Sequence, residues 1–598
     1  MTLNALASAR ARSYLLWGAA ASAATLLFYC LLLRPIIRSY FPTGDELALE
    51  VVSTPIGAHL NPASWFTQGF HFYFVPYPEW GIANTNFWRP LANVLFWTYY
   101  QLFGTHWSDQ LVVGYLAHAL VVALTGYIAY CQLKLNGWLT ALAMLIAAFN
   151  PAMWAHNEDR ISFSYNTAPE LIQYPVFQDE MLCTLLMLCA YIAFLHGRFV
   201  LLCALATVAL LLKETALTVP IAAMMLIGVW WRPDPGRAAR NFLWLILPLI
   251  VWYAVRLAVF DYRGSVYVLS SASRWRWLLK PIRNLLFLPT FLYMGPLQVT
   301  REAIQQHRIG VLALQGYQLA VNSAWWLALL YALGRVYQQL RSHGLQALSQ
   351  PWICGLVFAL GNLGLVVLLQ VPDPRLAYFW FTLGPAALFA SLADRRYGIL
   401  AASLIALTLV IPQFWSVSRT LSSAAMQSYY LSKHAATQLV KLLAGLPPGV
   451  HTVYLVDDVV LQGTSPQYLA EFAGYPGRLV IVNTVAPTIG CQVQQPVAAR
   501  YALARGQADT VLDYHAPPCF YQHDEAPLPL LYDQQVARGQ WMTYRFPELK
   551  LEPSQPLGQD YDMGEQWSVA VEDPTCAVSG ACVWLGLDLA RQAYYVLP

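Results

Sequence analysis

The sequence predicts a polytopic α-helical membrane protein with a C-terminal α/β domain, and three observations support that prediction. Of the 598 residues, 58% are hydrophobic and only 11% are charged, whereas soluble proteins carry about 25% charged residues. Apolar runs of membrane-spanning length recur as far as residue 421, and the part that follows has the composition of a soluble domain. The net charge of +3 is too small to indicate a nucleic-acid partner.

The apolar runs predict about eleven membrane helices, because a span needs ~20 apolar residues. They cover residues 14–37, 109–131, 138–155, 179–196, 199–213, 215–231, 240–260, 311–334, 352–370, 377–393 and 398–419. The segment Trp275–Leu297 is also apolar, but three prolines interrupt it, so we expect it to be interfacial or re-entrant. No small-residue cleavage site follows the first run, which is therefore expected to be an uncleaved signal anchor.

Lysine and arginine in the short connections predict the orientation of these helices. If Trp275–Leu297 does not cross, these residues all fall on the cytoplasmic face: Arg10, Arg12, Lys134, Arg198, Arg232, Arg237, Arg240, Arg335, Arg341, Arg395 and Arg396. A membrane domain of residues 1–421 then has its N-terminus in the cytoplasm, and its first loop, 38–108, lies outside. The domain 422–598 also lies outside, and Thr452–Val456 and Leu479–Val482 are expected to be strands in it.

The ten cysteines divide between these two domains. Six lie in apolar runs and are most simply buried small hydrophobic residues: Cys30, Cys131, Cys183, Cys189, Cys203 and Cys354. The other four lie in the C-terminal domain, where export favours disulfides. We prefer the pairs Cys491–Cys519 and Cys576–Cys582, although four cysteines allow three pairings.

Two charged motifs lie in the first outer loop. Asp45 and Glu46 come shortly after the first membrane helix, where a carboxylate can act as a general base or bind a divalent cation. A solvated acidic pair explains them equally well. Arg89 precedes Pro90, where we expect a helix to begin, and it is either a phosphate ligand or a structural residue.

Acidic residues also gather after the third predicted helix. Glu158 and Asp159 lie in the next outer loop, and Asp179 and Glu180 begin the fourth predicted helix. These carboxylates include candidates for a metal site or a second catalytic acid, but a solvated loop would have the same composition. Their spacing does not demand a metal.

Two basic residues complete the candidates. Lys213 and Glu214 interrupt an apolar stretch, which indicates either a structural ion pair or a lysine that neutralises a lipid phosphate. Arg375 lies in an outer loop, where its guanidinium can bind an anion or be neutralised by Asp373. On the predicted topology all of these motifs face the same side of the membrane.

Taken in order, these motifs resemble the GT-C superfamily of integral membrane glycosyltransferases. The order is an acidic pair after the first helix, an Arg-Pro-Leu element at Arg89, a Lys-Glu pair at Lys213, and an Arg-x-x-Tyr element at Arg375. The resemblance is closest to the protein O-mannosyltransferase-like and aminoarabinose-transferase-like branch and covers residues 10–420. It implies a bacterial inner-membrane enzyme with a polyprenyl-phosphate-linked sugar donor, and the C-terminal domain in the periplasm.

The resemblance also implies roles for individual residues. Asp45 matches the catalytic carboxylate, with Glu46 as its neighbour, and Asp179 or Glu158–Asp159 matches a second acidic site. Arg89, Lys213 and Arg375 match basic residues near the donor phosphate. No cofactor is required, and a divalent cation could replace one basic residue. The acceptor is an exported protein such as a pilin, a lipid or a glycan.

Other classes of protein share parts of this pattern. A transporter or lipid flippase also has many helices and cavity-facing charges, but we find no inverted repeat or interrupted helix pair. A polysaccharide ligase or polymerase would carry its large outer loop late in the chain, whereas here that loop is early. A non-enzymatic assembly factor leaves the common sidedness of the charges unexplained. The identities of the sugar and the acceptor stay open.

Overall fold

The computed structural model divides the chain into two compact units. It describes residues 3–32, 34, 89–103, 107–150, 178–230, 235–260, 289–290, 304–305, 307, 309–368, 377–421, 437–456, 473–482, 500–505, 509–516, 550–553, 565–572, 581–588 and 593–597. The described residues up to 421 belong to the first unit, and those from 437 onward belong to the second.

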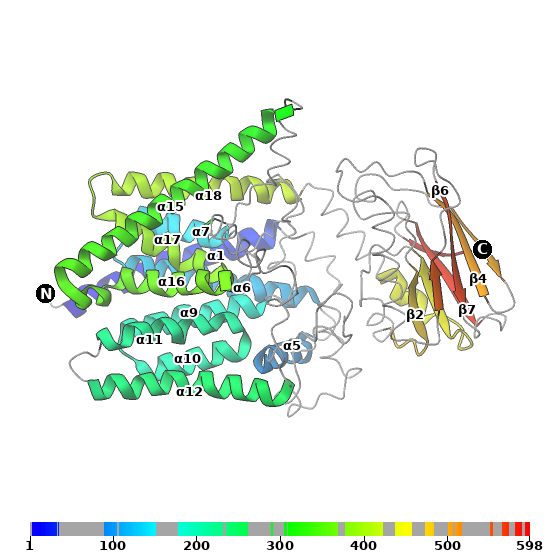
Figure 1. Ribbon diagram of the computed structural model, residues 1–598, viewed down its shortest axis with the longest axis horizontal. Coiled ribbons are helices and arrows are strands. Elements are labelled where there is room, and N and C mark those ends of the chain that lie inside the picture. Colours follow the sequence, from blue (N-terminus) through cyan, green and yellow to red (C-terminus); the bar gives the residue numbers. More distant parts are fainter. Residues whose placement is uncertain are drawn as a thin grey trace. The chain divides into compact units, whose positions relative to one another are not determined.

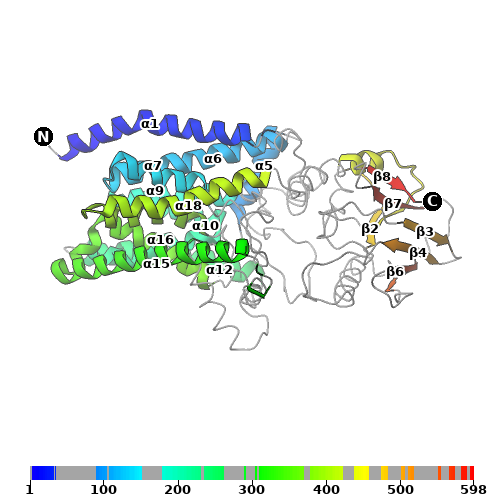
Figure 2. The same ribbon diagram turned by 90° about the horizontal axis from the view of Figure 1, so that it is seen from above.

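The first unit is built from helices that run side by side, with α15 inclined to its neighbours (Figures 1 and 2). Its elements are α1 (Leu3–Leu32), α5 (Pro90–Phe103), α6 (Trp107–Tyr127), η3 (Ile128–Gln132), α7 (Gly137–Ala148), α9 (Gln178–Leu195), α10 (Phe199–Leu212), η6 (Glu214–Leu217), α11 (Thr218–Trp230), α12 (Pro235–Phe260), α15 (Ile309–His343), η7 (Gly344–Ser349), α16 (Pro351–Leu368), α17 (Tyr378–Ala393) and α18 (Gly398–Leu421). As predicted, α5 begins at Pro90, because the fixed φ of proline suits the first position of a helix.

The helices have the length and surface of a membrane protein. Among the described residues, five stretches are long and apolar enough to cross a bilayer: Arg10–Leu32, Asp109–Gln132, Gln178–Leu195, Pro235–Val255 and Gln315–Ser349. Shorter apolar helices cover the other predicted runs. Large apolar side chains are exposed on their surfaces, with Leu16 82% and Val200 84% exposed. Such a surface is costly in water and favourable in lipid, so the prediction of a helical membrane protein is confirmed at this level.

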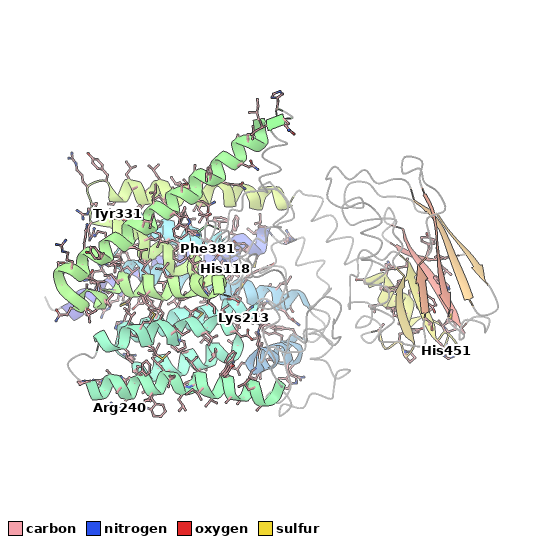
Figure 3. The ribbon with its side chains drawn as sticks, in the orientation of Figure 1. His118, Lys213, Arg240, Tyr331, Phe381 and His451 are labelled. Carbon is pink, nitrogen blue, oxygen red and sulfur yellow. The ribbon has the colours of Figure 1, made fainter. Side chains whose placement is uncertain are left out.

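One end of the first unit gathers the basic connections between helices. Arg10 at the start of α1 donates a hydrogen bond to the Tyr130 carbonyl oxygen over 3.4 Å. Arg395 donates to the Tyr331 hydroxyl over 3.1 Å, and Figure 3 shows Tyr331 and Arg240 toward this same end. We call it the basic end. His118 and Lys213 lie toward the other end (Figure 3).

A tight hairpin joins α9 and α10 at the basic end. It also determines which residues of the two helices meet at the opposite end of the unit. Gly197 lies in the turn with φ +65°, a left-handed conformation that glycine adopts without steric cost. The two helices then pack antiparallel along their length. As a consequence, the first turn of α9 lies beside the last turn of α10.

The second unit contains two described sheets. One has the order β2-β1-β7-β8, formed by β1 (Thr452–Val456), β2 (Arg478–Val482), β7 (Cys582–Asp588) and β8 (Ala593–Val596). Strand β1 is parallel to β2 and β7, and β8 is antiparallel to β7. The other is antiparallel, in the order β3 (Arg500–Arg505), β4 (Asp509–Ala516), β6 (Glu565–Glu572), β5 (Lys550–Pro553). The two strands predicted from sequence are confirmed as β1 and β2.

A helix over residues 437–444 covers one face of the first sheet. Leu439 and Leu443 from this helix pack with Val453, Leu455 and Leu479 from the sheet, and all five are buried. The alternation along β1 turns Tyr454 away from Val453 and Leu455, and its ring stacks on Trp584 of β7 at 4.2 Å between centroids. Helix and strands thus share one apolar core.

The cysteines follow the expected division. The six in the apolar runs form no disulfide, and Cys183 and Cys354 are buried. Cys582 is disulfide-bonded. Its partner lies outside the described residues, as do Cys491, Cys519 and Cys576, so the two preferred pairings stay predictions.

Candidate functional site

The α9–α10 hairpin brings three charged side chains into contact. Asp179 and Glu180 lie in the first turn of α9, and Lys213 follows the last turn of α10. The Lys213 Nζ atom is 3.2 Å from Asp179 Oδ1 and 2.9 Å from Glu180 Oε2. Lys213 itself has an extended backbone, with φ −158° and ψ 145°, so the chain leaves the helix at this residue.

Arg89 joins this group from the residue before α5. Its Nη2 atom is 2.8 Å from Glu214 Oε2, and its Nε atom donates to the same oxygen over 2.8 Å. Its Nη1 atom is 3.5 Å from Asp179 Oδ2. Asp179 therefore bridges Arg89 and Lys213 through its two oxygens. We call Arg89, Asp179, Glu180, Lys213 and Glu214 the ionic cluster.

A hydroxyl supports the most buried carboxylate of the ionic cluster. Thr215, in the short helix η6, donates a hydrogen bond from Oγ1 to Glu180 Oε1 over 3.0 Å. The Glu180 carboxylate thus receives Lys213 on one oxygen and Thr215 on the other. Such pairing on both oxygens is what a buried carboxylate needs, because an unpaired charge in a dry interior is very costly.

The ionic cluster is buried and carries more negative than positive charge. Glu180 is 0% exposed, Asp179 1% and Lys213 5%. Three carboxylates face two cations, which is a formal excess of one negative charge. Burial lowers the pKa of Arg89, but Glu214 and Asp179 raise it by more, so the net direction is upward. Arg89 therefore stays charged, and both cations are already engaged by carboxylates.

The structure brings together five residues that the sequence placed in three separate motifs. Arg89, Asp179, Glu180, Lys213 and Glu214 form one cluster, and Glu214 is in an ion pair whose partner is Arg89. The residues Asp45, Glu46, Glu158, Asp159 and Arg375 lie outside the described residues, so their predicted roles stay predictions. No group of three or more metal-ligating side chains occurs among the residues that were described.

A neutral polar network that the sequence did not reveal lies in the same half of the unit. His118 of α6 has Nδ1 2.5 Å from the Tyr378 hydroxyl and Nε2 3.1 Å from the Ala148 carbonyl oxygen. Asn150 donates to the Tyr378 carbonyl oxygen over 3.1 Å, and the Tyr29 hydroxyl donates to that of Ala148. A histidine inside an apolar run was the available signal.

The start of α9 is also fitted closely to α6. Gln178 donates to the Gln110 carbonyl oxygen over 2.6 Å, and its side chain lies across Gly114. A Cβ atom at Gly114 would stand 2.6 Å from Gln178 Nε2, so a larger residue there would force the Gln178 side chain to shift. This packing fixes the backbone just before Asp179 and Glu180.

Comparison with known proteins does not narrow the possible functions of this chain. Neither a protein-family model nor a curated protein sequence matches the chain. The functional interpretation therefore depends on the geometry of the ionic cluster and on the motifs in the sequence.

Proposed function

We propose that this chain is a glycosyltransferase that moves a monosaccharide from a polyprenyl-phosphate carrier to an exported acceptor. The observation that carries the proposal is the buried ionic cluster, which three distant stretches of chain assemble at the ends of membrane helices. Intramembrane or rim charges of this kind are costly to keep and usually functional. Their position suits a lipid phosphate, which also lies at the rim of the bilayer.

The proposed topology puts the ionic cluster on the outer face. We assign as spans the eleven apolar helices, five long and six shorter, that occur among the described residues. The basic end then faces the cytoplasm by the positive-inside rule. The ionic cluster lies at the opposite end, toward the periplasm of a bacterial inner membrane. The C-terminal unit follows α18 on that same outer side.

The chemistry divides between cations and a base. Arg89 and Lys213, together with Arg375, stabilise the charge that develops on the departing phosphate. The acceptor attacks the anomeric carbon of the sugar while Asp45 takes the acceptor's proton. The configuration at that carbon is inverted, and no covalent enzyme intermediate forms. Asp179 and Glu180 hold Lys213 in position. Because carboxylates already match both cations, an arriving phosphate needs the further positive charge of Arg375.

The position of the charges favours transfer over transport. Asp179, Glu180 and Lys213 all lie at helix ends. A transporter needs polar groups near the middle of the membrane, where its substrate is handed across. A ligase or polymerase would use an oligosaccharide on a pyrophosphate carrier instead, so donor chemistry distinguishes it.

The test uses the full chain in lipid nanodiscs with radiolabelled polyprenyl-phosphate monosaccharides and an extract of exported proteins and lipids. Wild type should transfer label to an acceptor. Asp45→Asn should lose at least about a hundredfold in rate, the usual scale for a general base. Asp109→Asn is the matched control, because Asp109 is an exposed carboxylate in the first turn of α6.

One outcome would overturn the role of Asp45, and two others would overturn the proposed function. Full activity of Asp45→Asn would remove Asp45 from the mechanism. Movement of intact donor across the bilayer without loss of its sugar would indicate a flippase. Use of only pyrophosphate-linked oligosaccharides would indicate a ligase or polymerase.

A further inference from the structure

The first turn of α17 is held by side chains from several other elements. Ala377 stands at its N-cap position and has no side chain able to cap the helix. The Trp380 backbone N–H instead donates to Asn362 Oδ1 of α16 over 3.2 Å. The Tyr378 carbonyl oxygen accepts from Asn150, and the Tyr378 hydroxyl bonds to His118. Asn362 thus accepts an N–H that the side chain of a capping residue would otherwise accept, and the two bonds of Tyr378 add to this hold.

His118 is at the centre of this arrangement. The Ala148 carbonyl can only accept, so His118 Nε2 carries a proton and donates to it. In the neutral ring, Nδ1 then has only an acceptor lone pair, and the Tyr378 hydroxyl donates to it. One imidazole therefore connects α6, the end of α7 and the start of α17. Tyr29 of α1 reaches the same Ala148 oxygen.

The network is buried and adjacent to the ionic cluster. His118, Tyr378, Tyr29 and Asn150 are all 0% exposed. Helix α17 also packs against α9, whose first turn carries Asp179 and Glu180. Arg375 is three positions before Tyr378 in the sequence. Fixing the start of α17 therefore fixes the attachment point of the segment that carries Arg375.

We propose that His118 is a positioning residue, which holds the first turn of α17, the turn that follows Arg375 in the sequence, and thereby supports binding of the donor phosphate. The claim about the donor phosphate rests on the proposed function, whereas the claim about the first turn of α17 does not. His118 touches no reacting atom. Its loss should therefore weaken use of the donor lipid far more than it slows sugar transfer from bound donor.

The chain offers a matched control for this network. Tyr191 of α9 is also a buried tyrosine, and its hydroxyl donates to the Pro351 carbonyl oxygen at the start of α16 over 2.6 Å. Tyr191→Phe and Tyr378→Phe thus each remove a buried hydroxyl that donates a hydrogen bond at a helix start, to a carbonyl oxygen in one case and to an imidazole nitrogen in the other. A merely structural effect of a lost hydroxyl should appear in both.

The kinetic experiment compares four variants in nanodiscs with titrated polyprenyl-phosphate sugar. His118→Leu and Tyr378→Phe should each raise the donor KM about tenfold, the scale of one lost buried hydrogen bond, with kcat little changed. His118→Gln keeps one acceptor and one donor and should stay within about threefold of wild type. Tyr191→Phe should leave the donor KM unchanged. Equal KM values in Tyr378→Phe and Tyr191→Phe, or a loss confined to kcat, would overturn the inference.

A second measurement separates this inference from the proposed function. Amide hydrogen exchange of residues 378–382 should be faster in His118→Leu than in wild type, and unchanged in His118→Gln and Tyr191→Phe. Unchanged exchange in His118→Leu overturns the positioning role whatever the activity. If wild type transfers no sugar but exchange rises as expected, the proposed function and the donor role of Arg375 fail, while the positioning of α17 stands.

Discussion

The two ends of the helical unit each contain ion pairs, but their surroundings differ. At the basic end, Arg335 Nη2 lies 3.5 Å from Asp394 Oδ2, and the Asp394 side chain is 76% exposed. In the ionic cluster, Lys213 Nζ lies 3.2 Å from an Asp179 side chain that is 1% exposed. The carboxylate of a cation–carboxylate pair is thus solvated at one end and enclosed by protein at the other.

Burial changes what such a pair does for the protein. Exposed pairs contribute about 0–1 kcal/mol, because water screens them and ordering two long side chains costs entropy. A buried pair gains little net stability when formed, yet removing one partner leaves an uncompensated charge and costs about 3–5 kcal/mol. Removing one member of the ionic cluster is therefore expected to destabilise the fold, which keeps these charges in a fixed geometry. A pre-organised phosphate site requires such a fixed geometry.

The largest effect is expected at Lys213. Lys213→Met removes a cation that contacts both Asp179 and Glu180. The variant should lose about 3–5 kcal/mol of unfolding free energy, because in a dry site Glu180 loses the cation that it contacts and Asp179 loses the nearer of its two. Thermal unfolding in detergent measures this loss, with the fluorescence of a protein fused to the chain as the signal. A variant as stable as wild type would show that water reaches the site.

A compensated variant sharpens this comparison. Lys213→Met combined with Asp179→Asn and Glu180→Gln removes the charges together and should recover most of the lost stability, since neutral groups of the same shape are tolerated. Sugar transfer should not recover, because the phosphate still lacks Lys213. Recovery of transfer along with stability would show that Lys213 is structural only.

The sequence predicted the helices more completely than it predicted the site. The run 179–196 lies within one residue of α9, Gln178–Leu195, because there the apolar stretch and the helix end together. The run 14–37 missed the start of α1 at Leu3, and 311–334 missed the end of α15 at His343. Hydropathy reports where a helix is apolar, and both helices continue as helix through polar residues such as Arg10 and Arg341.

The sequence identified the charged residues of the ionic cluster but not which of them form ion pairs with one another. A charge in an apolar stretch is conspicuous, so Lys213 and Glu214 were selected from the sequence alone. Which charge meets which depends on packing: Arg89 pairs with Glu214 across 125 positions of chain. The His118 network escaped because neutral hydrogen bonds between an imidazole, a phenol and a carbonyl leave no pattern in composition. Tyr378 was noticed only beside Arg375.

A smaller effect is expected when Arg89 becomes lysine. The Arg89 fork meets Glu214 with Nε and Nη2, and Asp179 with Nη1. Lysine keeps the charge but cannot serve both carboxylates in this planar geometry. Arg89→Lys should therefore cost about 1–3 kcal/mol of unfolding free energy, with a raised donor KM. The same thermal and kinetic measurements detect it, and a loss as large as that of Lys213→Met would contradict the ranking.

The smallest effect is expected at the basic end. Asp394→Ala removes the exposed partner of Arg335, whose Nη1 also donates to the Ser391 carbonyl oxygen over 3.4 Å. The guanidinium keeps that bond and gains water, so the unfolding free energy should fall by about 1 kcal/mol or less. Sugar transfer should be unchanged, because this pair lies far from the ionic cluster. Raising the salt concentration should reduce even this small difference, since exposed charges are screened while the buried cluster is not. A loss at Asp394 comparable to that at Lys213 would mean that burial does not separate the two ends, and the argument for a specialised site would lose its basis.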